Sequence, residues 1–390
     1  MFGGCYSCLA IGFNSYENRI FAHRNNSYQQ MNTGVILVGS GISGSLIGYF
    51  LSRLKVDFIV VDDQNQSSPS RVAAGIMHPL VFKRLTKSWR VQDFNEVVYQ
   101  VYSEIEAQTG ESFFNIEDYL KVLNSIEEVN NWEAKRAQSD MNELMGEVAD
   151  NQNTAVKAEF GFGMVKHAGY LNTKKFLSAC ANQLGDRLIQ HQFDYSKLVV
   201  SEDGVSYKNG ELDIQAKHII FADGPNSAHN PYFNWLPYQL VKGEVITIHA
   251  PELKLDSIVN QGVFVCPIGD DKYTVGATYD WKNLNQVPTD EGLAELEEKL
   301  QKFIQTPYTV VEHKAGIRPA VRERRPFIGK HPKHNNMWLF NGMGSKAVMM
   351  APYWAKHFVN HMLKGETLDS EVDIQRYYSI FEENMGHAKN

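Results

Sequence analysis

Hydrophobic and polar positions near the start of the chain form two continuous apolar runs separated by a stretch with helical spacing. Residues 35–38 and 58–61 are continuously apolar, which is typical of buried parallel strands. Residues 43–54 have the apolar spacing of a helix packed on one face. Four glycines and three serines interrupt residues 35–51, so this segment is too polar for a membrane span. We therefore predict a strand, a helix and a second strand.

Further helices follow from apolar spacing and from capping residues. Residues 92–109 and 289–305 have the pattern of amphipathic helices. Asn172 or Thr173 is placed to cap a helix that ends at Gly185. The polar stretch 125–153 predicts surface helices and a loop.

Strand patterns occupy two later regions. Residues 218–221 read as another buried strand, which ends in a turn of small residues. Residues 238–280 show period-two alternation punctuated by glycine, proline and aspartate, which predicts antiparallel strands. Residues 315–363 return to a strand, a glycine turn and a long helix. A parallel-sheet domain made from separated stretches, with an antiparallel sheet inserted between them, explains this order.

The predicted fold is therefore α/β, with a Rossmann-like nucleotide-binding domain and an inserted α+β substrate domain. The nucleotide-binding domain has a mostly parallel sheet and is discontinuous, and we assign to it residues 31–91, 157–230 and 311–390. The substrate-binding domain carries the antiparallel sheet and comprises residues 92–156 and 231–310. Residues 1–30 are expected to be a flexible N-terminal extension or the product of an upstream start, because Met31 leads directly into the first strand.

Composition narrows the class of protein. The chain has 390 residues, of which 43% are hydrophobic and 21% charged, as in globular proteins. Its net charge of −7 argues against a nucleic-acid partner. Residues 1–30 lack the basic region and apolar core of a secretion signal.

The cysteines indicate neither a disulfide framework nor a metal site. Cys180 and Cys266 stand in apolar contexts and read as buried thiols. Cys5 and Cys8 form a Cys-x-x-Cys with no second pair, so we expect no metal there. A reducing compartment, the cytoplasm, is the expected location.

Glycines after the first strand predict a dinucleotide site. Gly39 would make the tight turn, Gly41 would let a pyrophosphate approach the backbone, and Gly44 would let the helix pack close to the strand. The helix begins at about Ile42, and its free N–H groups favour an anion. Asp62 ends the second strand, where a carboxylate can accept hydrogen bonds from a ribose.

Four segments in this order resemble the D-amino-acid oxidase superfamily of FAD-dependent oxidoreductases, which includes glycine oxidase and sarcosine oxidase. They are "VGSGISG" with "VVDD", "SRVAAGIMHP", "IIFADGPNS", and "AGIRPAVRERRPFIG" followed by "NGMGSKAVMMAP". The resemblance covers about residues 33–365. Two positions depart from the family pattern: Ala347 replaces a third glycine, and Asp62 stands where relatives often have glutamate.

The resemblance implies that the nucleotide is FAD. No cysteine matches the covalent attachment site of sarcosine oxidases, so FAD is expected to bind noncovalently. The residues expected to hold it come from the glycine turn, the second strand, the segment after it, and the later strand ends. They are Gly39, Ser40, Gly41, Ile42, Ser43, Gly44, Asp62, Asp63, Ser70, Arg71, Ala73, Ala74, Gly75, Ile76, Phe193, Ala222, Asp223, Gly224, Gly342, Met343, Gly344, Ser345, Lys346 and Ala347.

Arg318 is the expected substrate anchor. A planar guanidinium binds a carboxylate with two hydrogen bonds, and the matching arginine has this role in the amino-acid oxidases that the motif resembles. The alternative is a surface ion pair, because Arg322, Arg324 and Arg325 form a charged cluster nearby. Arg318 differs from them in standing between an isoleucine and a proline.

Four other residues are candidates for the substrate site. Phe264 and Tyr279 match pocket positions of glycine-oxidase-like relatives, or they are core aromatics. His78 is a possible base near the flavin, although a single histidine is more often structural. Lys346 follows the glycine turn and would stabilise a reduced, anionic flavin, or it faces solvent.

The resemblance therefore predicts oxidation of the C–N bond of a small amino acid or secondary amine, by hydride transfer to flavin N5. The final electron acceptor is O2 or another, unidentified acceptor. One alternative is a tRNA-modifying flavoenzyme, because "GMGSKAVMMAP" and "AAGIMHPL" also resemble the FAD half of the bifunctional enzyme that processes carboxymethylaminomethyl-uridine in tRNA. The other is a non-catalytic module that binds FAD or NAD.

Overall fold

The computed structural model describes residues 30–210 and 212–387. The predicted N-terminal extension, including Cys5 and Cys8, lies outside the described residues apart from residue 30. Among the helices that the structure describes, none is both long enough and apolar enough to cross a bilayer.

The first sheet contains the predicted strand–helix–strand unit. Strand β1 (Gln30–Val38) lies between β2 (Phe58–Asp62) and β14 (Leu212–Phe221), and all three are parallel. Helix α1 (Ile42–Arg53) connects β1 to β2, as the apolar spacing predicts. Two further parallel strands extend the sheet, β11 (Leu188–Gln190) beside β2 and β21 (Met337–Asn341) beside β14. Antiparallel strands complete it: β12 (Leu198–Val200), β13 (Val205–Asn209) and β20 (Phe327–Lys330).

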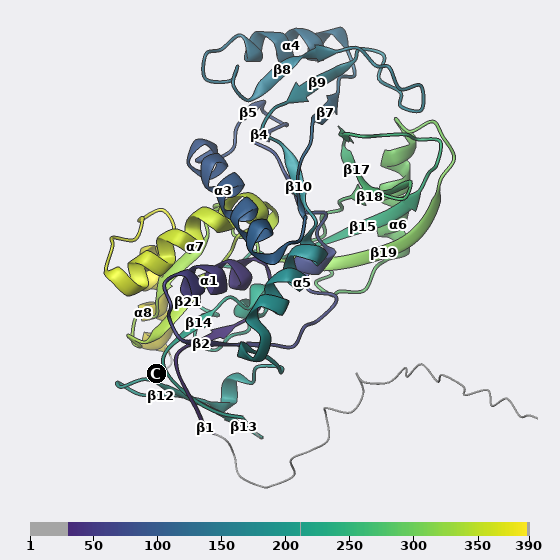
Figure 1. Ribbon diagram of the computed structural model, residues 1–390. Coiled ribbons are helices and arrows are strands. Elements are labelled where there is room, and N and C mark those ends of the chain that lie inside the picture. Colours follow the sequence, from purple (N-terminus) through teal and green to yellow (C-terminus); the bar gives the residue numbers. More distant parts are fainter. Residues whose placement is uncertain (1–29, 211, 388–390) are drawn as a thin grey trace, which may run out of the picture.

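Helices cover one side of this sheet. Helix α7 (Ala347–Lys364) packs against α1 and against α3 (Val91–Thr109), and the three lie next to one another (Figure 1). Helix α5 (Thr173–Leu184) also contacts α1. Its N-cap is Asn172, whose side chain accepts a hydrogen bond from the Lys175 N–H, and its C-cap is Gly185, so the predicted capping is confirmed. The C-terminal helix is α8 (Tyr378–His387).

The second sheet is antiparallel except where β7 (Tyr119–Val122) and β16 (Ile258–Gln261) pair in parallel. Its order is β19-β15-β18-β17-β16-β7-β9-β8. The remaining strands are β8 (Met145–Ala149), β9 (Phe162–Val165), β15 (Val241–His249), β17 (Val263–Gly269), β18 (Lys272–Gly276) and β19 (Thr309–Arg318). Helix α6 (Asp290–Gln301) packs on it, and α4 (Ile126–Arg136) lies beside β8 (Figure 1). The α/β fold with an additional antiparallel sheet is confirmed.

Smaller elements connect the two sheets. They are the short helix α2 (Pro69–Val72), the hairpin of β4 (Leu80–Val81) and β5 (Thr86–Lys87), and a small sheet of β3 (Ile76–Met77), β10 (Gly169–Leu171) and β6 (Phe114–Ile116). The single-turn 3₁₀ helices are η1 (Gly185–Arg187), η2 (Tyr195–Lys197), η3 (Gly224–Ala228), η4 (Gly344–Lys346) and η5 (Ile374–Tyr377).

Three elements near the expected domain limits pack with the sheet of the other domain. Strands β9 and β19 pair within the second sheet, although all of β9 and most of β19 fall in ranges assigned to the nucleotide-binding domain. Helix α3 packs on α7 beside the first sheet, although its residues fall in the substrate-domain range. The residue limits of the two domains stay a prediction. Within the polar stretch 125–153, a strand, β8, follows α4 because Met145 and Gly146 are buried against β9.

A buried ion pair on β15 connects the second sheet to the start of α6. The Nζ of Lys242, which is 0% exposed, lies 3.1 Å from Oε1 of Glu244, and the Nε2 of His313 lies 2.8 Å from the other carboxylate oxygen. The Thr289 N–H and hydroxyl donate to Glu244 at 3.0 and 2.9 Å, and Thr289 also caps α6. Burial acts to raise the pKa of Glu244, but these hydrogen bonds and Lys242 outweigh burial, and the pKa lies below its usual value. The carboxylate is thus held charged at a helix N-terminus.

We expect Glu244→Gln to lower the free energy of unfolding by about 3 kcal/mol, because it leaves the Lys242 ammonium buried without its counter-charge. Urea denaturation of wild type and variant measures this. Lys302→Ala breaks an exposed i,i+4 pair with Glu298 and serves as the control, with no change expected in the urea midpoint. Equal midpoints for Glu244→Gln and wild type would show that the buried pair does not stabilise the sheet.

Candidate active site

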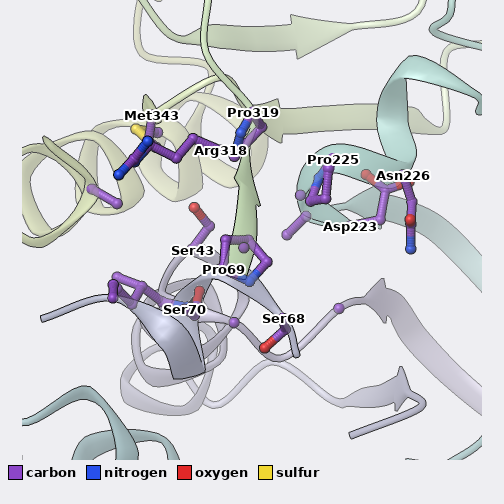
Figure 2. Close-up of a pocket in the computed structure, with 18 of the residues that line it drawn as sticks. Ser43, Ser68, Pro69, Ser70, Asp223, Pro225, Asn226, Arg318, Pro319 and Met343 are labelled. Atoms are coloured by element: carbon purple, nitrogen blue, oxygen red, sulfur yellow. Dashed lines mark hydrogen bonds between the residues drawn. The ribbon is translucent and has the colours of Figure 1, made fainter. Parts of the chain in front are cut away.

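A cavity of about 440 Å³ lies where the carboxyl ends of β1, β2 and β14 meet the end of β19. Figure 2 shows its labelled residues around one space, with Ser43 and Ser68 to Ser70 on one side, Arg318 and Met343 on another, and Asp223, Pro225 and Asn226 on a third. Open α/β sheets bind ligands at this edge. The predicted residues that line it are Gly39, Gly41, Ile42, Ser43, Asp62, Asp63, Ser70, Ala73, Ala74, Gly75, Ile76, Phe193, Ala222, Asp223, Gly224, Met343, Gly344, Ser345, Ala347 and Arg318.

Other predicted residues lie outside the cavity lining, as far as the described residues show. They are Ser40, Gly44, Arg71, Gly342, Lys346, Tyr279, Phe264 and His78. Gly44 and Ser40 still shape the site from behind it. The Arg71 guanidinium donates to Gln64 Oε1 at 2.8 Å, next to Asp62.

Close backbone approach explains two of the glycines. Gly39 has φ of +99°, and a Cβ there would lie 2.5 Å from the Ala222 carbonyl oxygen of β14. A Cβ on Gly44 would overlap with the Gly39 carbonyl. Side chains at either position would therefore separate α1 from β1 or β1 from β14.

The N-terminus of α1 can hold an anion. Gly41 is its N-cap and provides no side-chain hydrogen bond, and Gly41, Ile42 and Ser43 place this helix end in the cavity lining. The Ser70 hydroxyl accepts from the Ile42 N–H at 3.2 Å, and a Cβ on Gly41 would lie 2.8 Å from it. The backbone and the absence of a Gly41 side chain thus fit the pyrophosphate of a dinucleotide.

Asp62 orders the turn that surrounds this helix end. Its carboxylate accepts from the backbone N–H groups of Ser40 and Gln64, each at 2.7 Å. The Gln64 side chain donates to both Ser40 Oγ and Asp62 Oδ1, at 2.7 and 2.9 Å. Binding of a ribose by Asp62 stays a prediction. Gln64 is a residue that the sequence motif did not identify.

The sequence motifs also did not identify the polar network around Asp223. The Tyr195 hydroxyl donates to its carboxylate at 2.8 Å, the Asn341 amide donates at 3.2 Å, and the Ser227 hydroxyl donates as well. Burial raises the pKa of Asp223 even though these hydrogen bonds oppose the shift. The network connects the end of β14 to η2, η3 and β21, and it fixes the far wall of the cavity. Its members stand in three separate segments, around residues 195, 223–227 and 341, so no local pattern identifies the whole network.

Arg318 lies at the end of β19, half-buried in the cavity wall. Its Nη1 donates to the carbonyl oxygens of Thr278 and Lys242 at 3.3 and 3.5 Å. Its guanidinium carbon lies 4.6 Å from the centre of the Tyr279 ring. No carboxylate among the described residues forms an ion pair with it. Burial lowers its pKa from the usual value, so the charge stands in a poorly hydrated place.

Gly243 makes room for this guanidinium, and the sequence motif did not identify it. A Cβ on Gly243 would overlap with both terminal nitrogens of Arg318. The guanidinium is therefore held between the backbone of β15 and the ring of Tyr279. Tyr279 is 52% exposed and stacks on Trp281 with 6.0 Å between ring centres. Phe264 lies on β17 against Gly276, where a Cβ would meet its ring at 2.8 Å.

His78 and Lys346 lie together behind the cavity. The His78 ring stacks on Phe82 and lies tilted against Tyr119, with ring centres 4.7 and 5.0 Å away, and its buried Nδ1 has no hydrogen-bond partner among the described residues. Burial, with the charge of Lys346, lowers its pKa to about 3. The Lys346 ammonium donates to the Ser88 hydroxyl, and burial lowers its pKa to about 8. The predicted buried thiols, Cys180 and Cys266, are confirmed and lie outside the cavity lining.

Comparison with known proteins assigns this arrangement to a family. A family model described as FAD dependent oxidoreductase (DAO) matches residues 34–361. Glycine oxidase of Pseudomonas putida is 25% identical over 363 residues, which cover 87% of this chain and 96% of that protein. The bifunctional tRNA 5-methylaminomethyl-2-thiouridine biosynthesis protein MnmC of Marinobacter nauticus is 26% identical, over 42% of this chain and 28% of that protein.

The fold agrees with solved structures. The crystal structure of glycine oxidase from Geobacillus kaustophilus superimposes with a TM-score of 0.73 at 17% identity, over 87% of this chain and 96% of that one. The glycine turn, the uncapped helix end and the absence of a lining cysteine among the described residues fit FAD as a noncovalent cofactor. The chain belongs to the DAO family of FAD-dependent oxidoreductases.

Proposed function

We propose that the protein oxidises the C–N bond of a small amino acid or secondary amine, and that Arg318 binds the carboxylate of this substrate. The observation that carries the proposal is a half-buried guanidinium with no acidic partner among the described residues, in the same cavity as the dinucleotide turn. A charge that is already partly desolvated gains most from a ligand of opposite charge.

The geometry of Arg318 supports binding of a carboxylate from one side. Nη1 is occupied by the Thr278 and Lys242 carbonyls, which fixes the plane of the guanidinium. Nη2 and Nε have no acceptor among the described residues, so one edge can make two parallel hydrogen bonds to a carboxylate. The Tyr279 ring and the Gly243 backbone cover the two faces and keep this edge in place.

The remaining residues orient the substrate and exclude water. When bound, FAD supplies the acceptor for the hydride that leaves the carbon beside the nitrogen. Val245 and Met343, which also line the cavity, give it an apolar wall close to Arg318. An amine is therefore held at a fixed distance from its carboxylate, in a site that favours its neutral form. The cytoplasm stays the expected location, and O2 is one candidate for the final electron acceptor.

Two other functions receive less support. A net charge of −7 does not favour the polyanionic substrate of a tRNA-modifying enzyme. A module that binds FAD or NAD without turnover has no use for an unpaired arginine beside the dinucleotide turn.

Arg318→Ala tests the proposal directly. We expect kcat/KM for an amino-acid substrate to fall roughly 100-fold, or about 3 kcal/mol, with unchanged flavin content, because the carboxylate loses two charge-assisted hydrogen bonds. Anaerobic flavin reduction by glycine, sarcosine and D-alanine identifies a substrate and measures the loss. Arg322→Ala, in the exposed cluster nearby, is the matched control and should behave as wild type. Full activity of Arg318→Ala would refute the anchor, and no flavin reduction by any amine in wild type would refute the substrate class.

Gly243→Ala tests whether the Arg318 guanidinium needs the space beside the backbone of β15. The new methyl group would overlap with Arg318, so we expect KM to rise about tenfold or more while FAD remains bound. Gly48→Ala in α1 is the control, since a Cβ there meets Phe58 at an ordinary 3.5 Å. Substrate titrations of both variants give KM and kcat separately. An unchanged KM in Gly243→Ala would mean that the guanidinium does not need this position.

His78→Phe tests whether this histidine is a base or part of an aromatic stack. The unfolded chain protonates His78 near its usual pKa of 6.5, and the folded chain only near 3, so stability is lost as pH falls through this range. We expect the loss between pH 7 and pH 5, up to about 2 kcal/mol, to be smaller in the variant. Urea midpoints at the two pH values measure it. A catalytic base would instead show as a collapse of kcat in His78→Phe at every pH.

A further inference from the structure

A second cavity, of about 360 Å³, lies between α4, β7 and the turn that joins β4 to β5. These elements stand together at the end of the molecule away from α1 and β21 (Figure 1). The second cavity shares no lining residue with the cofactor cavity. Neither the dinucleotide motif nor Arg318 explains it.

The local sequence explains how this cavity forms. Residues 82–85 make a tight turn, closed by hydrogen bonds from Arg84 N to the Val81 carbonyl at 3.1 Å and from Leu85 N to the Phe82 carbonyl at 3.3 Å. Phe82 and Leu85 pack against the core, whereas Lys83 and Arg84 are exposed at the rim. Opposite this turn, Glu128, Trp132 and Lys135 come from successive turns of one face of α4.

The floor of the cavity is apolar and held in place. Trp132 is 0% exposed, and its Nε1–H donates to the Gly146 carbonyl at 3.0 Å, so it supports the floor from below, and the partly exposed Phe82 and Leu85 side chains give the floor its accessible apolar surface. Leu123 is buried beside it. The Phe82 ring stacks on His78 and Tyr119, with centres 4.7 and 5.3 Å away, and this fixes the wall nearest to the cofactor cavity.

Cations outnumber acids around this floor. The lining includes Lys83, Arg84, Lys121 and Lys135 but one carboxylate, Glu128, among the described residues. The Lys121 Nζ lies 2.8 Å from Glu128 and is thereby paired. The other three cations form no ion pair within residues 30–210 and 212–387. An excess of positive charge over an apolar floor is unusual in a chain of net charge −7 and favours an anionic ligand.

We propose that this cavity is a binding site for a small organic anion that carries an aromatic ring. The ring lies against Phe82 and Leu85, and the anionic group faces Lys83, Arg84 and Lys135. Binding there requires neither Arg318 nor the amine substrate, so this proposal does not depend on the proposed oxidase activity.

Calorimetric titration of the FAD-loaded Arg318→Ala protein with phenyl phosphate tests this site, because the cofactor cavity is filled and its anion-binding arginine is absent. Inorganic phosphate provides the anion without the ring, and phenol provides the ring without the anion. We expect phenyl phosphate to bind about tenfold more tightly than either of them. Equal affinity for phenyl phosphate and inorganic phosphate would contradict the aromatic part of the proposal.

Variants at the rim test the charges. We expect Lys83→Ala, Arg84→Ala and Lys135→Ala each to weaken phenyl phosphate binding about three- to tenfold, and Glu128→Gln to strengthen it, since removal of the carboxylate leaves Lys121 unpaired. Lys364→Ala, an exposed lysine in the last turn of α7, is the matched control and should bind as the parent does. The opposite sign at Glu128 separates charge from general loss of structure. If the three cation variants bind as tightly as Lys364→Ala, or if wild type binds no phenyl phosphate, the proposal is wrong.

Discussion

The close contact of α1, β1 and β14 at the glycine turn is the constraint on which the cofactor site depends. A side chain at Gly44 would overlap with the Gly39 carbonyl, and a side chain at Gly39 would meet the carbonyl of Ala222. Because these backbones touch, the N-terminus of α1 points at the carboxyl edge of the sheet. Asp62 then bonds to the backbone of Ser40 and holds the turn in that position. The site for a diphosphate is thus a property of the backbone, and few side chains contribute to it.

Arg318 reaches the same edge because its strand belongs to the other sheet. Strand β19 pairs with β15 along its length and ends at Arg318, beside the turn that precedes β20. The short helix α2 packs against β19, so the segment after β2 also lies against this strand. The cavity is therefore closed by one sheet on the side of the nucleotide and by the other on the side of the guanidinium. Such an interface between two sheets is a common place for a ligand site.

Local patterns in the sequence predicted most helices and strands, whereas several site residues depend on contacts between distant parts of the chain. The strand, glycine turn and helix at residues 35–54 follow from spacing alone, as do the caps of α5. Gly243 carries no local signal, because its role depends on the guanidinium of Arg318, 75 residues later in the chain. The partners of Asp223 are likewise spread over several segments. Strand β8 is hidden in a polar stretch because it lies at the edge of its sheet and only part of it is buried.

Strand β15 shows how one alternating sequence serves both the stability of the protein and its site. Lys242 and Glu244 point to one face, where they bind the loop before α6 and the helix end itself. Gly243 and Val245 point to the other face and line the cavity. A register slip of one residue would place a lysine and a glutamate against Arg318 and expose the apolar positions to the loop. The buried ion pair therefore fixes the register of β15, and through the register it keeps the space at Gly243 in which the guanidinium lies.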